Sequence, residues 1–265
     1  MGVVNVTPDS FSDGGRWVDP AAAALHGIAL VDDGADIVDV GGESTRPGAD
    51  PVSIEEETER VEPVVAALAA AGVVVSVDTS KVDVAAAAVA AGAQIVNDVT
   101  ALGSPAMGEF CSAAGVGVVL MHMLGTPRSM QVNPHYDNVV GDVRRYLEER
   151  VGAAVAVGIE GDRICLDPGI GFGKTVAHNL QILAGLAAFT SADQPILVGT
   201  SRKGFLGSIL EASGRTTDTA ARGAATVATV AASILAGAAV VRVHDVGSAL
   251  DAVRIADAIV RVPQP

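Results

Sequence analysis

Eight short apolar runs recur along this chain, and each one stops at a polar or charged residue. They are VVNVTPDSF (3–11), IVDVGGESTRPG (37–48), VVVSVDTSK (73–81), IVNDVT (95–100), VVLMH (118–122), ICLDPGIGFGK (164–174), ILVGTSRK (196–203) and VVRVHD (240–245). A run of four or five apolar, mostly β-branched residues is typical of a strand buried on both faces, as in a parallel sheet. Polar residues at the ends of such strands form the functional sites of α/β barrels. The pattern therefore predicts both the fold and the location of the chemistry.

Alanine-rich segments separate these runs, and six of them end at a glycine, which supplies the left-handed conformation that terminates a helix. The glycines are Gly34, Gly72, Gly92, Gly115, Gly158 and Gly237. Strands are expected at 2–6, 36–40, 73–77, 94–97, 117–121, 164–166, 195–198 and 239–243. Helices are expected at 20–33, 54–71, 80–91, 105–114, 138–157, 176–188, 202–212, 219–236 and 246–260.

Strands that alternate with helices pair in parallel through right-handed crossovers. We therefore predict an α/β fold, a (β/α)8 TIM barrel, as one domain over residues 1–265. An open doubly wound sheet is the alternative, but it would need edge strands more polar than any of these runs. The longest predicted loops, 7–19, 41–53 and 122–137, all follow strands, and long loops on one face usually serve function.

Composition narrows the class of protein. Hydrophobic residues make up 49% and aromatic residues 3%, so small aliphatic side chains must build the core. A net charge of −14 argues against a general binder of nucleic acid or anionic membranes, and an anionic ligand would need a local basic site. The three lysines, Lys81, Lys174 and Lys203, each closely follow a predicted strand. Cys111 and Cys165 lack metal-binding spacing and fit core thiols in a reduced cytoplasm.

The stretch 223–241 carries no charge and is long enough to be considered as a membrane span. Alanine, threonine and glycine dominate it, and Gly237 interrupts it before a β-like segment. We expect a buried barrel helix followed by a strand, and no membrane association.

Three strand ends carry amide or carboxylate side chains: Asp78, Asn97 and Asp167. Unpaired carboxylates are costly in a buried barrel mouth. They either pair with Lys or Arg and cap the following helices, or they face a ligand rich in N–H donors. The second reading fits the amino-pyrimidinone edge of a pterin or purine, with Lys203 as a further donor to the ring.

Cationic side chains also gather near the ends of the strands: Arg46, Arg202, Lys203, Arg242 and His244. Arg242 and His244 alternate on the last strand, so their side chains point the same way. If that direction is inward, they suit a phosphate or diphosphate; the alternative is a set of salt bridges on the exterior. Residues 201–203 also open a helix, whose first N–H groups attract anions.

Hard oxygen ligands are present in the first loop, where Asn5, Asp9 and Asp13 could bind a magnesium ion that is held mainly by substrate phosphates. The residues Thr45 and Arg46, in the second loop, either turn the chain before a helix or contribute to the site. His122 lies at the mouth of the fifth strand.

Together these motifs resemble the dihydropteroate synthases, a family of folate-pathway enzymes targeted by sulfonamides. The segments that carry the resemblance are MGVVNVTPDSFSDGG (1–15), DVGGESTRPGA (39–49), SVDTSK (76–81), IVNDV (95–99), LMHMLGTPRSMQ (120–131), LDPGIGFGKTVAHN (166–179), VGTSRKGFLG (198–207) and VRVHDV (241–246). They span nearly the whole chain in the order found in the family.

The resemblance implies a condensation of 6-hydroxymethyl-dihydropterin pyrophosphate with p-aminobenzoate. It assigns the pterin to Asp78, Asn97, Asp167 and Lys203, with Met121 packing against it. It assigns the diphosphate to Arg242 and His244, Mg2+ to Asn5, loop closure to Thr45 and Arg46, and the walls of the aminobenzoate pocket to Phe172 and Pro47. A homodimer in the cytoplasm is also implied.

In the implied mechanism, diphosphate leaves first and the neutral arylamine attacks the resulting pterin-methylene cation. The catalytic residues are then Asp78, Lys203, Arg242 and His244. Gly204 departs from the pattern, because some relatives carry a serine there that helps to hold the aminobenzoate carboxylate. The alternatives are a pterin-binding methyltransferase and a catalytically silent pterin-binding homologue, and pyrophosphate release separates them from a synthase.

Overall fold

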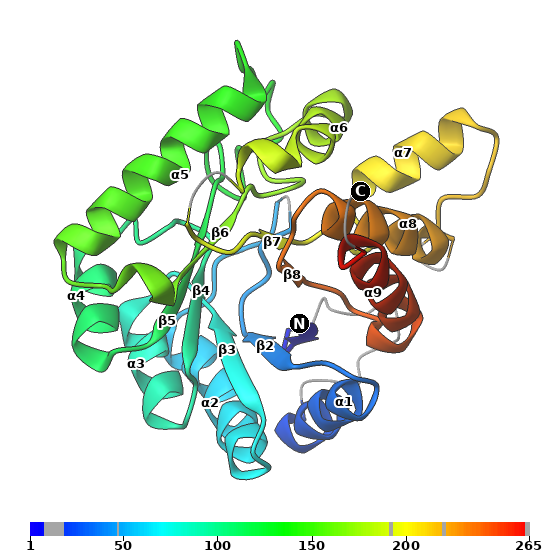
Figure 1. The fold of residues 1–265 in the computed structure, drawn as a ribbon. Helices are drawn as coiled ribbons and strands as arrows, with labels where there is room; N and C mark the ends of the chain where they lie inside the picture. Colours follow the sequence, from blue (N-terminus) through cyan, green and yellow to red (C-terminus); the bar gives the residue numbers. More distant parts are fainter. Residues whose placement is uncertain (8–18, 47, 191–192, 219–220, 263–265) are drawn as a thin grey trace.

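Parallel strands and the helices between them form the whole of the described fold (Figure 1). The computed structural model describes residues 1–7, 19–46, 48–190, 193–218 and 221–262. The strands there are β1 (Gly2–Asn5), β2 (Ile37–Gly41), β3 (Val74–Asp78), β4 (Ile95–Asp98), β5 (Gly117–Met121), β6 (Ile164–Asp167), β7 (Leu197–Val198) and β8 (Val240–Val241). The helices are α1 (Pro20–Asp32), α2 (Ile54–Ala70), α3 (Val82–Ala90), α4 (Pro105–Ala114), α5 (Val139–Ala156), α6 (Val176–Ala184), α7 (Gly204–Ala212), α8 (Arg222–Leu235) and α9 (Val246–Val260), with 3₁₀ turns η1 (Gly161–Arg163) and η2 (Leu186–Ala188).

The barrel closes where the end of the chain meets its beginning. Strands β1 to β6 pair in chain order, and β7 pairs with β8. Parallel bridges join the two sheets, from Leu166 to Ile196 and from Gly2 to Val243. The amide of Val3 donates to the carbonyl of Val243 at 3.1 Å. The predicted single-domain (β/α)8 barrel is confirmed, and the open-sheet alternative is wrong.

Two predicted helix boundaries differ by more than the usual one or two residues of fraying: the helix expected at 176–188 ends at Ala184, and the helix expected at 219–236 begins at Arg222. The strands expected at 195–198 and 239–243 are each two residues long, because the barrel closes there through single bridges rather than a continued ladder. The helix expected from residue 202 begins at Gly204. Arg202 has a φ of 60°, a left-handed conformation that cannot belong to a right-handed helix.

The six glycines expected to end helices all have positive φ, from 65° at Gly115 to 116° at Gly92. At Gly92 the spatial constraint is also clear, because a Cβ atom there would lie 2.5 Å from the Cβ of Ala69. The sequence therefore predicts these helix ends for the right physical reason.

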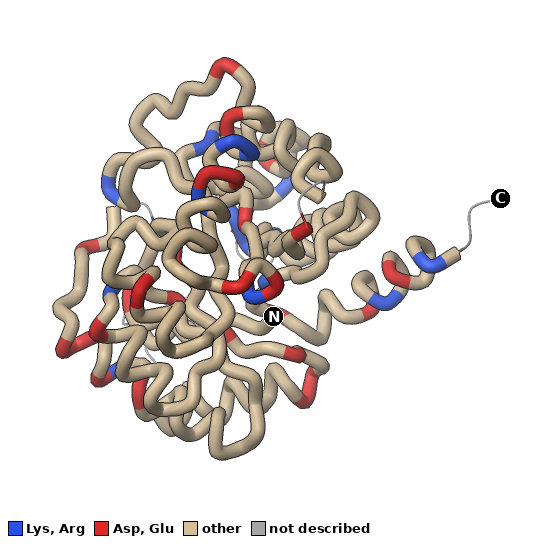
Figure 2. Tube along the Cα trace, turned by 60° about the vertical axis from the view of Figure 1, so that its left-hand side comes forward, with Lys and Arg blue, Asp and Glu red and all other residues tan. Residues whose placement is uncertain are grey.

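The core lies between the strands and the surrounding helices. Strand valines such as Val40 and Val77 pack, wholly buried, with helix residues such as Val61 and Leu68. Acidic residues are spread over the outer helices, with fewer basic ones between them (Figure 2). The uncharged stretch forms α8 after its first residue and the whole of β8, and none of the helices in the described ranges is long and apolar enough to cross a membrane. Cys111 and Cys165 are free thiols.

Candidate active site

The strand register places the predicted polar side chains on one inner row at the carboxyl ends of the strands. Asn5 aligns with Gly41, which aligns with Asp78, and Asp78 aligns with Asn97. Met121 aligns with Asp167 in the same way, two residues beyond the partner of Asn97. Aligned residues of neighbouring parallel strands face the same side. The residues Asn5, Asp78, Asn97, Met121 and Asp167 therefore all point into the mouth of the barrel.

Arg242 lies at the centre of one half of this mouth. Its Nε donates to Asp39 Oδ2 at 2.6 Å, and its Nη2 donates to Asp78 Oδ2 at 2.9 Å. Asn97 Nδ2 donates to the same oxygen of Asp39 at 3.0 Å. Arg242 therefore forms ion pairs, but these lie inside the barrel, whereas the salt-bridge alternative placed them on the exterior. Asp78 is paired with an arginine, as one of its two readings expected.

Asp39 is a member of this cluster that the sequence analysis missed. It is fully buried in β2, and its Oδ1 has no hydrogen-bond partner within the described part of the chain. The signal was available, because an aspartate inside the apolar run IVDV (37–40) needs a buried cation or donor. The sequence could not say that the donors come from Arg242 and Asn97, which lie far along the chain.

Burial in the barrel raises the pKa of Asp78 to about 7, and the carboxylates of Asp39 and Glu57 raise it further while Arg242 opposes them. The 2.9 Å ion pair favours the ionised form in the structure itself. A carboxyl group with a pKa near neutrality changes its charge readily when a ligand brings N–H donors or removes a cation.

The other half of the mouth holds Asp167 and Lys203. Burial raises the pKa of Asp167, and the amide of Gly169, which donates to its Oδ1 at 2.7 Å, opposes that rise. Burial and the neighbouring Arg242 lower the pKa of Lys203 to about 8, against the attraction of Asp167. Lys203 Nζ lies 4.1 Å from the centroid of the Phe172 ring, a cation–π distance. The predicted pterin lysine and the predicted aminobenzoate wall are therefore direct neighbours.

His244 is held as a neutral imidazole. Its backbone amide donates to Ser201 Oγ at 3.2 Å, and its Nδ1 lies 3.0 Å from the same hydroxyl oxygen. Burial lowers the pKa of His244 to about 3, together with the charges of Arg242 and Arg202. In the tautomer in which the serine hydroxyl donates to Nδ1, the ring proton lies on Nε2, which is then a donor for an anion.

The loop after β2 is anchored at its base. Lys81 Nζ contacts carboxylate oxygens of Glu43 and Glu57 and donates to the carbonyl of Val52 at 2.8 Å. The amide of Val52 donates to Glu43 at 3.1 Å, which closes the loop on itself. Thr45, from this loop, lines a pocket that reaches Asp78. Lys81 is thus a structural anchor of the loop.

Arg46, in the same loop, is exposed, and its charge is among those that lower the pKa of His244. Pro47, Asp9 and Asp13 lie outside the described residues. Among the residues that are described, no group of three or more His, Cys, Asp or Glu side chains could hold a metal ion.

His122 and Lys174 form a second cluster, on the outer side of the strand ends. His122 follows the inward-facing Met121, so its ring points away from the mouth, edge-on to Tyr146 with centroids 4.9 Å apart. Lys174 Nζ lies 2.9 Å from His122 Nδ1. Burial lowers the pKa of Lys174 to about 7, and that of His122 to about 3.

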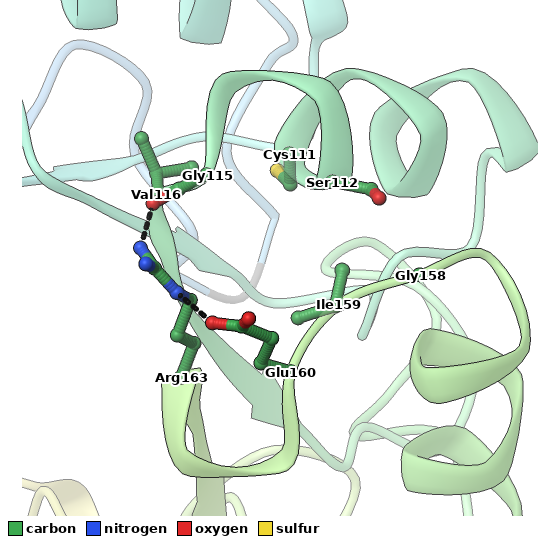
Figure 3. A pocket seen from close by; sticks show the side chains of 8 residues that line it. All are labelled: Cys111, Ser112, Gly115, Val116, Gly158, Ile159, Glu160 and Arg163. Atoms are coloured by element: carbon green, nitrogen blue, oxygen red, sulfur yellow. Dashed lines mark hydrogen bonds and ion pairs between the residues drawn. The ribbon is translucent and has the colours of Figure 1, made fainter.

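A separate small pocket lies at the opposite end of the barrel (Figure 3). Arg163 spans it, contacting the carbonyl of Gly115 at the end of α4 and donating to Glu160 at 2.8 Å. These contacts cap a helix end and pair a surface arginine. This end of a barrel serves stability, and the pocket is separate from the chemistry.

Comparison with known proteins gives a consistent result. The profile of the pterin binding enzymes matches residues 1–244. Dihydropteroate synthase of Neisseria meningitidis serogroup C is 48% identical over 263 residues, covering 98% of this chain and 92% of that protein. The Yersinia pestis dihydropteroate synthase in complex with a sulfonamide drug has a TM-score of 0.94 at 42% identity, covering 99% and 94% of the two chains. The Xanthomonas albilineans enzyme with 4-aminobenzoic acid has a TM-score of 0.90 at 46% identity, covering 99% and 93%.

Proposed function

The chain belongs to the pterin binding enzymes, and we propose that its barrel mouth condenses 6-hydroxymethyl-dihydropterin pyrophosphate with p-aminobenzoate. The products are dihydropteroate and pyrophosphate, so the enzyme is a transferase with dihydropteroate synthase activity. Residues 1–265 would act as one pterin-binding domain. The observation that carries this proposal is the inward row of Asp78, Asn97 and Asp167, which faces Lys203 and Arg242 in one enclosed mouth.

The pterin ring would bind along this row. Asp78 and Asp167 offer buried acceptors for its amino and ring N–H groups, and the Asn97 amide can both donate and accept. Lys203 would donate to the ring carbonyl or N5, and Met121 would pack against the ring face. Because both carboxylates are withdrawn from water, binding of a ligand with several N–H groups is favourable. The ligand supplies the hydrogen bonds that water would otherwise donate.

The diphosphate would bind beside Arg242 and His244. Arg242 provides a guanidinium already positioned by two carboxylates, and His244 provides Nε2–H. The N-terminus of α7 adds backbone N–H groups with a favourable dipole. These donors would stabilise the negative charge that grows on the leaving diphosphate, which is the kind of contribution expected to dominate the catalysis.

A magnesium ion fits the donor chemistry of Asn5. The side chain of Asn5 lies at the end of β1, on the same inner row as Asp78. Its amide oxygen is a hard ligand, and Mg2+ commonly takes few protein ligands when substrate phosphates supply the rest. The ion, when bound, neutralises charge on the diphosphate.

The aminobenzoate would bind on the outer side of the pterin, against Phe172 and the stem of Lys203. Thr45 and Arg46 would close over it from the loop after β2, and the resemblance gives Pro47 as a further wall of this pocket. Gly204 has open space around it, since a Cβ atom there would meet nothing within 4 Å. The backbone amide of this residue is left to receive the carboxylate that a serine hydroxyl would otherwise help to bind.

In the reaction, the C–O bond between the pterin methylene and the diphosphate breaks, and its electron pair leaves with the diphosphate. The carboxylate of Asp78 would stabilise the pterin-methylene cation. The lone pair of the arylamine then forms the new C–N bond, and the amine nitrogen loses one proton. Because the arylamine is already nucleophilic, no strong general base is needed.

The deciding experiment is pyrophosphate release when both substrates are mixed with enzyme and magnesium. We expect pyrophosphate and dihydropteroate to form in equal amounts. When p-aminobenzoate is omitted, pyrophosphate release should not exceed the background hydrolysis of the pterin substrate. Pterin binding without release would instead indicate a silent homologue and overturn the proposal.

We also propose a homodimer, located in the cytoplasm. Exposed apolar side chains on α8 and α9 support a dimer: Leu235, Ile255 and Ile259 are 50%, 64% and 52% exposed. Light scattering measures the mass in solution and so tests the dimer.

Sulfonamides would compete for the aminobenzoate pocket, as the drug complex of the Yersinia pestis relative suggests.

A further inference from the structure

Lys174 is one of the most deeply buried charged residues of the described chain, and its partners are unusual. It is only 3% exposed, and its Nζ lies 2.9 Å from His122 Nδ1, 2.9 Å from the carbonyl of Gly169 and 3.0 Å from that of Phe172. An ammonium group has three N–H donors, and these are three acceptors at good distance. The side chain therefore joins the end of β5 to both ends of the segment 169–172.

The same segment is tied by other side chains. Gln131 Nε2 donates to the carbonyl of Gly171 at 2.8 Å, and Tyr136 Oη donates to the carbonyl of Gly173 at 2.8 Å. Gly169 has a φ of 68°, and a Cβ atom there would lie 1.9 Å from the carbonyl oxygen of His122. The loop 169–173 is thus pressed against the chain after β5, with most of its carbonyls bound by side chains.

The loop in turn supports two groups of the proposed site. The Phe172 ring lies under the ammonium of Lys203 at 4.1 Å. At Gly171, a Cβ atom would come within 3.2 Å of Lys203 Cδ, so the loop backbone packs directly against the lysine stem. A shift of the loop by about 1 Å would therefore move both the wall of the aminobenzoate pocket and the lysine beside it. A misplacement of about this size is enough to lower the rate of reaction in a preorganised site.

We propose that Lys174 is a positioning residue for aminobenzoate binding, which acts by fixing the loop 169–173 and through it Phe172. This rests on the function proposed above. Removing the ammonium leaves three buried acceptors without donors, and the loop relaxes to hydrate them. Lys174 touches no substrate in this account, and its effect passes through Phe172.

The test compares Lys174→Met with Tyr136→Phe, which removes a different tie of the same loop and leaves the Lys174 contacts in place. Without substrates, we expect amide hydrogen exchange at Gly171 and Phe172 to quicken by about tenfold or more in K174M, and by less in Y136F. With substrates, we expect the KM for p-aminobenzoate to rise by about tenfold in K174M, with a smaller change in the KM for the pterin diphosphate.

A double-mutant cycle with Phe172→Ala identifies the route. If Lys174 acts through Phe172, adding K174M to F172A should change the aminobenzoate KM by less than about threefold. A full tenfold effect in the F172A background, or an unchanged KM despite faster exchange, would overturn the proposal. If K174M does not fold, Lys174→Gln takes its place, because the glutamine amide still donates to some of the buried acceptors. The double-mutant cycle with Phe172→Ala is then measured in the same way. Absence of dihydropteroate in the parent enzyme would refute the proposed function instead, while the exchange result would still report on the loop.

Discussion

The two sides of the barrel mouth satisfy their buried charges in different ways. On one side, the carboxylate wall (Asp39, Asp78, Asn97 and Arg242) consists of side chains bound to one another. On the other side, the loop wall (residues 169–174 with His122) consists of a lysine bound mainly to backbone carbonyls and a ring nitrogen. Lys203 lies between the two walls.

This difference indicates which side a ligand can rearrange. Under the proposed function, the diphosphate would replace Asp78 as the partner of Arg242, and the N–H groups of the pterin would replace Arg242 as the partners of Asp78. The backbone carbonyls of the loop wall cannot be exchanged in this way without unfolding the loop. We therefore regard the carboxylate wall as the part that responds to substrate and the loop wall as the fixed template against which it closes.

The largest effect should come from breaking the carboxylate wall with Arg242→Met. We expect kcat/KM for the pterin diphosphate to fall by about 10³-fold, since a donor to the leaving group is lost. The buried Asp39 would also lose its cation, so unfolding by urea should show a loss of stability of roughly 3 kcal/mol. Adding Asp39→Asn should restore stability without restoring activity. Unchanged stability in the single variant would contradict the buried ion pairs.

Asp78→Asn should cost less in activity, about 10²-fold, and should alter the pH dependence of stability. The pKa of Asp78 is raised from 3.8 to about 7, so the folded state retains a proton that the unfolded chain releases in this window. Its contribution to the free energy of unfolding is therefore present at low pH and lost as the pH rises from about 4 to about 7. Urea titrations across this range should show a flatter dependence in D78N than in the parent, and parallel curves would count against the shift.

Lys203 tests the boundary between the walls. Its pKa is lowered to about 8, so the lysine loses its charge as the pH rises through that value. We expect kcat/KM for the pterin diphosphate to decline above about pH 8, and this limb of the profile to be absent in Lys203→Met, whose activity is lower by about tenfold or more throughout. A descending limb that persists in the variant would assign the titration to another group.

The smallest expected effect is tighter binding of p-aminobenzoate when a hydroxyl is added at Gly204, at the rim of the mouth. Gly204→Ser introduces a hydroxyl where a Cβ atom meets no neighbour, so the fold should tolerate it. We expect the KM for p-aminobenzoate to fall by about threefold, the scale of a single exposed hydrogen bond. Gly204→Ala is the matched control and should leave this KM unchanged; an equal improvement in both variants would point to the helix rather than to the hydroxyl.

The fold and much of the mouth were predictable because their signals are local. A buried strand needs its own apolar run, a helix end needs its own glycine, and the polar residue after each run marks the strand end. The missed features depend on partners that are distant in sequence. Asp39 is explained by its donors Arg242 and Asn97, and the inward or outward choice between Met121 and His122 is decided by the register with β6. Lys174 was noted for the scarcity of lysine, but the carbonyls that it binds carry no sequence signal at all.

If substrate takes over the partners of the carboxylate wall, its binding should release protons, and this release is the most direct test. The calorimetric titration uses 6-hydroxymethylpterin at about pH 7, in two buffers with different ionisation enthalpies. We expect the parent enzyme to release a fraction of a proton on binding, because the Asp78 carboxyl ionises to accept the pterin N–H groups, and we expect D78N to release none. Binding by the parent without any proton release, or release that is equal in D78N, would contradict it.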